Sequence, residues 1–232
     1  MLRLSYKMDR PHTSSPIIVD IQCFTDNKRS YILKEVCVLE MNTGVLLMHH
    51  IAKPPYHNSM LAIRRLKGNK WLTRNFHGLT WDQGDISYYD LHTKLTDCIS
   101  KRSIVYVKGL EKQVYLKLNH VRDRSITDVI DICNIGCEPI ASLYKQMADH
   151  VYMRCDNHNS IYSRCALTSC IAVRTWLIKS VQPGQQYCEM TGSNDRSDCS
   201  YFCSCFQTAT STTAATAASS CVGYDTVDGK TE

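Results

Sequence analysis

The order of the apolar segments is the feature that most constrains the fold of this chain. Three apolar runs come first, at residues 15–24, 30–41 and 44–55, with short loops between them. The first run, SPIIVDIQCF, reads as a continuous apolar strand, and the second, SYILKEVCVLEM, alternates like a half-buried strand. An Asn42-Thr43-Gly44 turn separates the second run from the third, so we expect three antiparallel strands.

The rest of the folded region alternates between helical and strand patterns. We expect, in order, a helix in 86–101, a strand in 103–109, a helix at about 111–119, a strand in 126–135, and helices in 140–148 and 162–181. Strands that alternate with helices in this way pack as a sheet with helices on its faces. The predicted fold class is therefore α/β, with a mixed sheet of three antiparallel strands followed by two parallel ones.

Composition separates this region from the two ends of the chain. Residues 183–232 begin with a turn-rich stretch and continue with a Thr/Ser/Ala run that has no hydrophobic period, so we expect a disordered, low-complexity tail. Residues 1–15 are expected to be flexible, which leaves 16–182 as one domain. No apolar run approaches the roughly 18 residues of a membrane span. We therefore expect an intracellular protein, cytoplasmic or nuclear, without a membrane partner.

The charge of the predicted domain is compatible with a nucleic-acid partner. The tail from Pro183 holds six acidic and two basic residues, so the rest of the chain has 25 bases and 16 acids, a net charge of +9. Basic residues also alternate with aromatic ones in one segment, RRLKGNKWLTRNF, which we interpret as a loop. Its candidate contacts to single-stranded DNA or RNA are Arg64, Arg65, Lys67, Lys70, Trp71 and Arg74. A charged loop anchored by a core tryptophan would have the same pattern.

The turn after the strand at 103–107 carries charge where α/β proteins bind ligands. Lys108, Gly109, Glu111 and Lys112 follow an apolar strand directly, at the edge where the carboxyl ends of parallel strands meet. Lys108 and Lys112 could hold a phosphate backbone there. The alternative is that both lysines are solvated charges at the start of a helix.

Several segments resemble, in their order, the DEDD-type 3′-to-5′ exonucleases of the ribonuclease H-like fold, in the subgroup with a catalytic histidine. The likeness runs from about Pro16 to Val181. IIVDIQCF is similar to the first motif of the family, FHGLTWDQGDISYYDL to the segment before its first helix, VYVKGLEKQVYL to its second motif, and HNSIYSRCAL to its third. The resemblance implies a ribonuclease H-like fold and an exonuclease-type site.

That family uses two divalent metal ions held by four carboxylates, with the histidine as general base. The resemblance places Asp20 at the first acid and Gln22 at the second, Lys112 at the third and Cys165 at the fourth. His158 precedes Cys165 by seven residues, whereas the family spacing is five. One clear acid of four cannot hold a magnesium pair. Magnesium or manganese is therefore expected only if the site is active with altered ligands, through Asp20, Glu111, His158 and Asp156.

A second group of residues has the spacing of a zinc site. Cys155 and His158 form a Cys-x-x-His pair, and Cys165 follows, with Cys137 or His150 as a possible fourth ligand. Structural zinc is one interpretation, and ordinary core thiols are the other. A cysteine nucleophile with His158 as base lacks a visible oxyanion group. We interpret His49 and His50, at a strand end, as packing or solvated residues.

Three hypotheses remain open from the sequence. The first is an exonuclease-like module that has lost two-metal catalysis and binds nucleic acid or regulates. The second is an active exonuclease that uses Asp20, Glu111 and His158. The third is a scaffold that binds a protein partner and contains a structural zinc.

Overall fold

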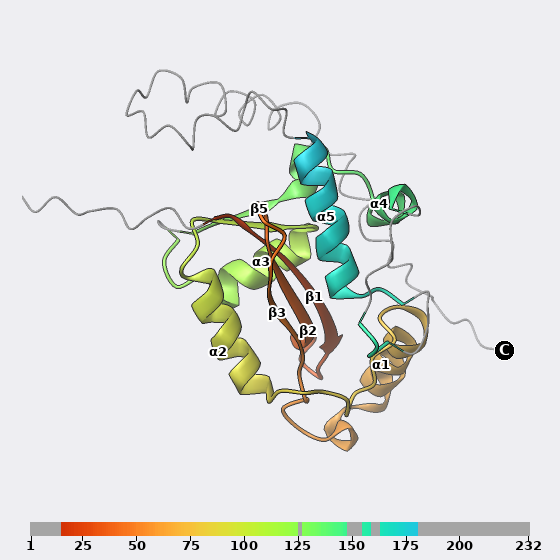
Figure 1. Cartoon of the computed structure of the whole chain (residues 1–232). Helices are drawn as coiled ribbons and strands as arrows, with labels where there is room; N and C mark the ends of the chain where they lie inside the picture. The colour runs from red at the N-terminus through yellow and green to blue at the C-terminus, as the bar shows by residue number, and fades with distance from the viewer. Residues whose placement is uncertain (1–14, 125–126, 148–154, 159–162, 181–232) are drawn as a thin grey trace, which may run out of the picture.

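The computed structural model describes residues 15–124, 127–147, 155–158 and 163–180 (Figure 1). Its elements, with η marking short 3-10 helices, are β1 (Ile17–Thr25), β2 (Tyr31–Glu40), β3 (Leu46–Ile51), η1 (Asn58–Met60), α1 (Ile63–Asn75), α2 (Tyr88–Ile99), β4 (Ile104–Val107), α3 (Leu110–Asn119), β5 (Asp128–Asp131), η2 (Ile132–Ile135), α4 (Ile140–Gln146) and α5 (Ala166–Ser180). Except for Ser15, the predicted flexible N-terminus and the predicted tail lie outside the described residues.

The five strands form one mixed sheet in the order β3-β2-β1-β4-β5. β2 pairs with β1 and with β3 in antiparallel fashion, whereas β4 is parallel to both β1 and β5. β1 lies at the centre because its side chains are apolar toward both faces, as Ile17, Ile18 and Val19 show. The predicted α/β class, a mixed sheet with three antiparallel and then two parallel strands, is confirmed.

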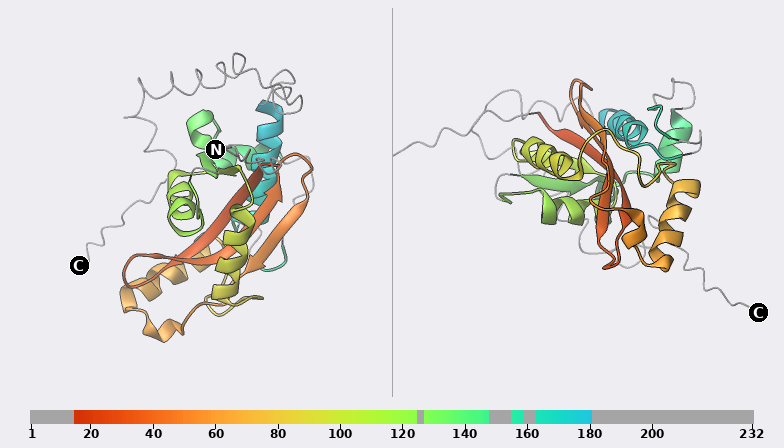
Figure 2. Two further views of the ribbon diagram at one scale, coloured as in Figure 1. Left: turned by 90° about the vertical axis from the view of Figure 1, so that its left-hand side faces the viewer. Right: turned by 90° about the horizontal axis from the view of Figure 1, so that it is seen from below.

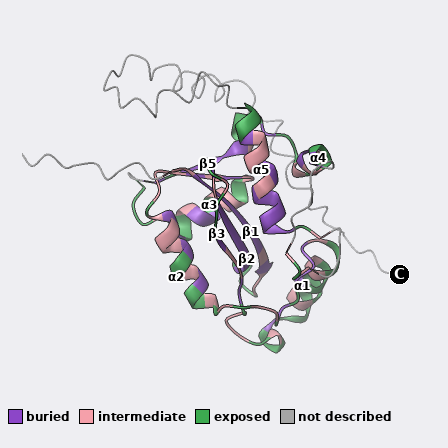
Figure 3. Ribbon diagram, viewed as in Figure 1, coloured by how far each residue is buried: buried purple, intermediate pink, exposed green. Residues whose placement is uncertain are grey.

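Helices cover both faces of this sheet. One face packs against α2 and α3, which contribute Leu91, Leu95 and Leu116 to the core, and the other packs against α5, which contributes Cys170 and Val173. The view from below in Figure 2 shows α2 and α3 on one side of the sheet and α4 and α5 on the other. Figure 3 shows the strands and the inner sides of α2 and α5 as the buried part of the molecule. No helix among the described residues is long and apolar enough to cross a membrane.

The prediction of a loop at residues 64–76 is wrong, because helix α1 forms there. An apolar stripe is missing from this helix, and Asn69 is its buried residue. The Asn69 side chain accepts a hydrogen bond from Thr25 N at 3.0 Å and donates one to Thr25 O at 2.9 Å. These two bonds attach α1 to the end of β1 without the hydrophobic period that marks a helix in a sequence.

His120 at the end of α3 makes the stability of the domain sensitive to acid. His120 is 1% exposed, Nδ1 lies 2.9 Å from Thr96 Oγ1, and Nε2 has no hydrogen-bond partner among the described residues. Burial, with a contribution from His92, lowers the pKa of His120 to about 3. The unfolded chain takes up this proton near pH 6.5, so stability is fully present above pH 6.5 and falls as the pH drops toward 3.

We therefore expect His120→Asn to flatten the acid side of the stability curve. An asparagine amide can still donate to Thr96 but cannot titrate. Urea unfolding at a series of pH values should show a slope between pH 6 and 4 that is smaller by up to about 1.4 kcal/mol per pH unit. An unchanged slope in the variant would show that other groups cause the acid sensitivity.

Candidate nucleic-acid cleft and metal-ligand cluster

A cleft of about 560 Å³ opens at the carboxyl ends of β1 and β4, beside α1. Its walls come mainly from β1, from α1 and the residue after it, from the β4–α3 turn and α3, from η2 and the start of α4, and from Arg164 before α5. The lining includes Asp20, Gln22, Trp71, Phe76, Lys108, Gly109, Glu111, Lys112 and Arg164. This is the edge at which α/β sheets bind their ligands.

Asp20, the buried acid of this cleft, is neutralised by a cation from the same chain. The Lys112 ammonium, in the first turn of α3, forms an ion pair with Asp20 Oδ1. Gln22 Nε2 donates a hydrogen bond to Asp20 Oδ2 at 3.3 Å. Burial raises the pKa of the Asp20 carboxyl, and the neighbouring Lys112 charge opposes that rise. Both oxygens of this carboxylate therefore face nitrogen donors.

The β4–α3 turn is held in shape by Asp131, at the end of β5. Asp131 Oδ1 accepts a hydrogen bond from Gly109 N at 2.8 Å. Gly109 has a φ of 107°, in the region that favours glycine, and α3 begins directly after it. Lys108 Nζ donates to the carbonyl of Cys137 at 3.4 Å. The charges after β4 thus belong to the cleft wall, and Glu111 lines the same cleft with an exposed side chain.

The basic segment on α1 contributes one residue of its predicted set to the cleft. Trp71 lines the cleft and is 53% exposed. The predicted contacts Arg64, Arg65, Lys67, Lys70 and Arg74 lie on the same helix but outside the cleft lining. The structure therefore brings Trp71, Lys108 and Lys112 together, although they were predicted from separate segments.

Arg164 is a cleft residue that sequence reasoning did not find. Its guanidinium lies 4.4 Å from the centre of the Phe76 ring, and its backbone N–H donates to Phe76 O at 2.8 Å. A cation over an aromatic face is held by electrostatic attraction to the ring. Arg164, an exposed residue, thus adds a positive charge to the cleft that Trp71 also lines, and no sequence pattern had indicated it.

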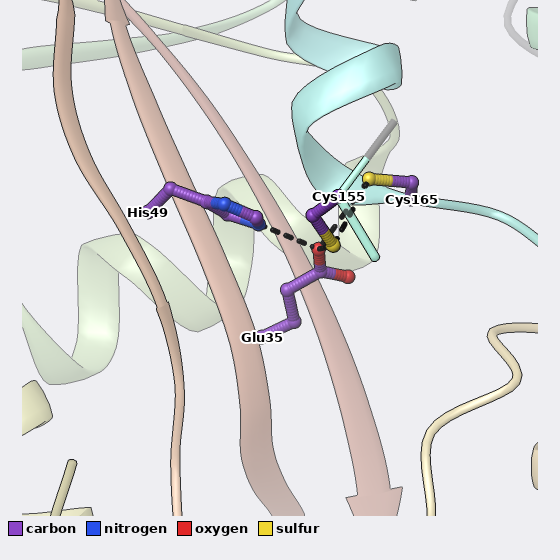
Figure 4. A group of neighbouring side chains, drawn as sticks. All are labelled: Glu35, His49, Cys155 and Cys165. Atoms are coloured by element: carbon purple, nitrogen blue, oxygen red, sulfur yellow. Dashed lines mark hydrogen bonds and ion pairs between the residues drawn. The ribbon is translucent and has the colours of Figure 1, made fainter. Parts of the chain in front are cut away.

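A second site lies on the α5 side of the sheet, where four potential metal ligands meet (Figure 4). Glu35 comes from β2, His49 from β3, and Cys155 and Cys165 from the chain before α5. One ligand atom of each lies within 4.8 Å of those of the other three. The Glu35 side chain is fully buried. Such a His/Cys/Glu group can bind a metal ion.

The predicted ligand set, Cys137, Cys155, His158 and Cys165, is brought together only in part. Cys155 and Cys165 belong to the group in Figure 4, and His158 lies next to it, with Nε2 3.3 Å from Glu35 Oε1. The thiol of Cys137 lies outside it and faces the carbonyl of Glu138 at 3.6 Å. His150 lies outside the described residues.

His158 is held in a buried position away from the cleft lining. Its side chain has no exposed surface, and Nδ1 forms a short hydrogen bond with the carbonyl of His77. A carbonyl only accepts, so Nδ1 carries a proton and Nε2 is the atom turned to Glu35. Hydrogen bonds to Cys165 and Glu35 outweigh the effect of burial and raise the pKa of His158 to about 10.

The thiols of Cys155 and Cys165 lie close together, but their pKa values are shifted in opposite directions. The Sγ atoms of Cys155 and Cys165 are 3.8 Å apart. The hydrogen bond from Cys155 is the main cause that lowers the pKa of Cys165 to about 2, and His158 acts in the same direction. The same thiol pair, together with burial, raises the pKa of Cys155. The pair thus favours the thiolate form at Cys165 over Cys155, and the thiolate is the form in which cysteine binds metals.

Glu35 and His49 are the cluster members that the sequence had not assigned. The β2–β3 pairing sets Cys37 opposite His49, and Glu35 is two residues from Cys37. Side chains at alternate positions and at paired positions share one face of a sheet. The hairpin turn at 42–44 was visible in the sequence, but a register shift between Val38 and Leu39 moves the β2–β3 pairing by one residue. A count from the turn would therefore have placed Glu35 and His49 on opposite faces.

Comparison with known proteins gives no family for this chain. No protein-family model matches it, and no curated protein matches it. A solved 3′-exonuclease that recognises the 3′ end of a histone mRNA stem-loop has 12% identity and a TM-score of 0.42, over 75% of this chain and 83% of its own. The Saccharomyces cerevisiae Pan2 pseudoubiquitin hydrolase-RNA exonuclease module, solved with AAUUAA RNA, has 12% identity and a TM-score of 0.45, over 79% of this chain and 32% of its own. Likeness at this level does not identify an activity.

Proposed function

We propose that this chain is an exonuclease-like domain that binds single-stranded nucleic acid without cutting it. The observation that carries the proposal is the ion pair between Lys112 and Asp20. In the DEDD-type resemblance these two positions belong to metal-binding acids, and here an ammonium faces the remaining carboxylate. The cation is part of the protein, so Asp20 is neutralised without a metal ion.

The donors in the cleft fit poorly to a pair of magnesium or manganese ions. Two-metal catalysis holds its ions about 4 Å apart between several carboxylates. Among the described residues the acids that line the cleft are Asp20 and Glu111. Each unit of positive charge on a metal about 4 Å from the Lys112 ammonium adds repulsion of about 4 kcal/mol at an effective dielectric of 20. The proposal therefore includes the loss of two-metal chemistry.

An active exonuclease with altered ligands has less support. That alternative needs His158 as general base next to a water at Asp20, with Glu111 and Asp156 as extra ligands. His158 is buried between Glu35 and the His77 carbonyl and does not line the cleft. Lys112 would also have to leave Asp20 before a metal ion could bind there.

The cleft has the two kinds of contact that single-stranded nucleic acid requires. Lys108 and Arg164 would bind phosphates. Lys112 would contribute less, because its ammonium already forms an ion pair with Asp20. Trp71 offers an exposed ring on which a base can stack. Phosphate contacts of this kind make binding salt-dependent and tolerant of sequence.

We expect the full-length chain to retard labelled single-stranded RNA or DNA in a gel at low salt, and to leave its length unchanged with Mg²⁺ or Mn²⁺. Affinity should fall with salt, with a log–log slope of about −0.7 for each phosphate contact. In the nuclease assay, the Asp20→Ala variant is the control for metal-dependent cleavage. Shortening of the substrate by the parent chain and not by Asp20→Ala would overturn the proposal, because it would show a working metal site.

A scaffold that binds a protein partner is the second candidate function. The buried cluster of Glu35, His49, Cys155 and Cys165 favours it, because a metal there would stabilise the fold without any role for the cleft. Thiolates and imidazole suit zinc far better than magnesium. Bound zinc together with no shift of either nucleic acid at low salt would favour this candidate over the first.

A further inference from the structure

The four ligand atoms of the cluster at the start of α5 lie within 4.8 Å of one another, and the distances among Glu35, Cys155 and Cys165 are close to those of a tetrahedral metal site. Around a zinc ion with bonds of about 2.3 Å to sulfur and about 2.0–2.1 Å to nitrogen or oxygen, ligand atoms lie roughly 3.3–3.8 Å apart. The Sγ atoms of Cys155 and Cys165 are 3.8 Å apart, and Glu35 Oε1 lies 3.7 Å from Cys165 Sγ and 4.0 Å from Cys155 Sγ. His49 Nε2 lies 2.9 Å from Glu35 Oε1. If both atoms bound a zinc ion, this distance would lengthen by about a few tenths of an ångström.

The surroundings hold these ligands in place. Glu35 Oε2 accepts a hydrogen bond from Ala166 N at 3.2 Å, which leaves Oε1 turned to the centre of the cluster. His158 lies 3.3 Å from Oε1 and is itself fixed by the His77 carbonyl. Outer contacts of this kind orient metal ligands in proteins. Two thiolates and a carboxylate around a zinc ion would give the site a net charge of −1.

We propose that Glu35, His49, Cys155 and Cys165 bind one zinc ion that has a structural role. Glu35 and His49 lie on neighbouring strands, whereas the two cysteines lie on the chain before α5. The ion therefore joins the β2–β3 pair to the start of the last helix. A zinc site of this kind contributes directly to folding. The inference does not depend on nucleic-acid binding.

A disulfide between the two cysteines is the competing use of the same sulfurs. It would bring them from 3.8 Å to about 2.05 Å and would remove both sulfurs as metal ligands. Glu35 would then keep its buried carboxylate with only the two histidines near Oε1. The zinc site uses all four groups, and this is why the geometry favours it.

The first test is metal analysis of the full-length chain purified without chelator. We expect about one zinc ion per chain, with X-ray absorption at the zinc edge showing two sulfur and two nitrogen or oxygen ligands. Three or four sulfur ligands would overturn the proposal, because the ion would then be held by other cysteines such as Cys199, Cys203 and Cys205. A metal-free chain with a Cys155–Cys165 disulfide, identified by mass spectrometry of its peptides, would overturn it as well.

Substitutions then test the individual ligands. Cys155→Ser and His49→Ala should each lose the bound zinc, whereas Cys137→Ser and Cys98→Ser should keep it. Cys137→Ser is the decisive control because the sequence pattern made Cys137 a ligand and the structure does not. Zinc lost in Cys137→Ser and retained in His49→Ala would contradict the assignment. If the ligand variants do not fold, the sulfur count of the parent chain still decides the question.

Discussion

Replacement of Lys34 by methionine is expected to lower the free energy of unfolding by roughly 2–5 kcal/mol. Lys34 is 1% exposed, and its ammonium donates to the carbonyls of Ala52 at 2.9 Å and Trp81 at 2.8 Å, with a third, short bond to Gln83. Methionine fills a similar volume but donates to none of them. The three main-chain acceptors remain in the variant, so the cost is that of buried polar groups without a partner.

Urea unfolding of the parent, Lys34→Met and Lys53→Met measures this effect. Lys53 lies next to Ala52 in the chain but is exposed, so the same change there should alter stability by less than about 0.5 kcal/mol. Equal effects of the two substitutions would mean that the loss of one positive charge, and not the three carbonyls, sets the result. The effect is large because total stabilities of single domains are about 5–15 kcal/mol.

The part of the fold that could be predicted is the part encoded locally. β1, β2 and β3 are apolar runs with turns between them, and β4 and β5 alternate with helices, so the mixed sheet follows from the pattern. α1 was missed because its anchor is Asn69, whose partner Thr25 lies 44 residues away. Lys34 gave no signal either, because a lysine inside an apolar strand is usually the exposed residue of the alternation.

The residues of the metal cluster also differ in how far the sequence could predict them. Cys155 and Cys165 lie ten residues apart and could be proposed from spacing. Glu35 lies 130 residues before Cys165, and only the sheet and the position of α5 bring them together. Cys137 was a reasonable fourth ligand by spacing, but its thiol lies outside the cluster and faces the carbonyl of Glu138.

The two sites share one segment of the chain. Cys165 belongs to the metal cluster, and Arg164, directly before it, lines the cleft over Phe76. An ion that fixes Cys165 would therefore also fix the cleft wall. If both proposals hold, removal of zinc should weaken nucleic-acid binding although no zinc ligand lines the cleft.

The double substitution Trp71→Ala/Arg164→Ala is expected to weaken binding of single-stranded RNA by roughly 30-fold or more. Loss of one base stack costs about 1–3 kcal/mol, loss of one phosphate contact adds to it, and 1.4 kcal/mol is a factor of ten. The salt slope should become less steep by about 0.7, because one phosphate contact is gone. Fluorescence anisotropy with a labelled oligonucleotide at several salt concentrations gives both values.

The matched control for this prediction is Tyr89→Ala/Lys94→Ala on α2. It also removes one exposed aromatic ring and one positive charge, but neither residue lines the cleft. Its affinity should stay within about twofold of the parent, because long-range charge effects are screened beyond about 10 Å at 0.1 M salt. Equal losses in the two double variants would mean that net charge attracts the RNA and that the cleft does not bind it. A loss confined to Trp71→Ala/Arg164→Ala places the strand in the cleft, across the end of β1 where Lys112 neutralises Asp20.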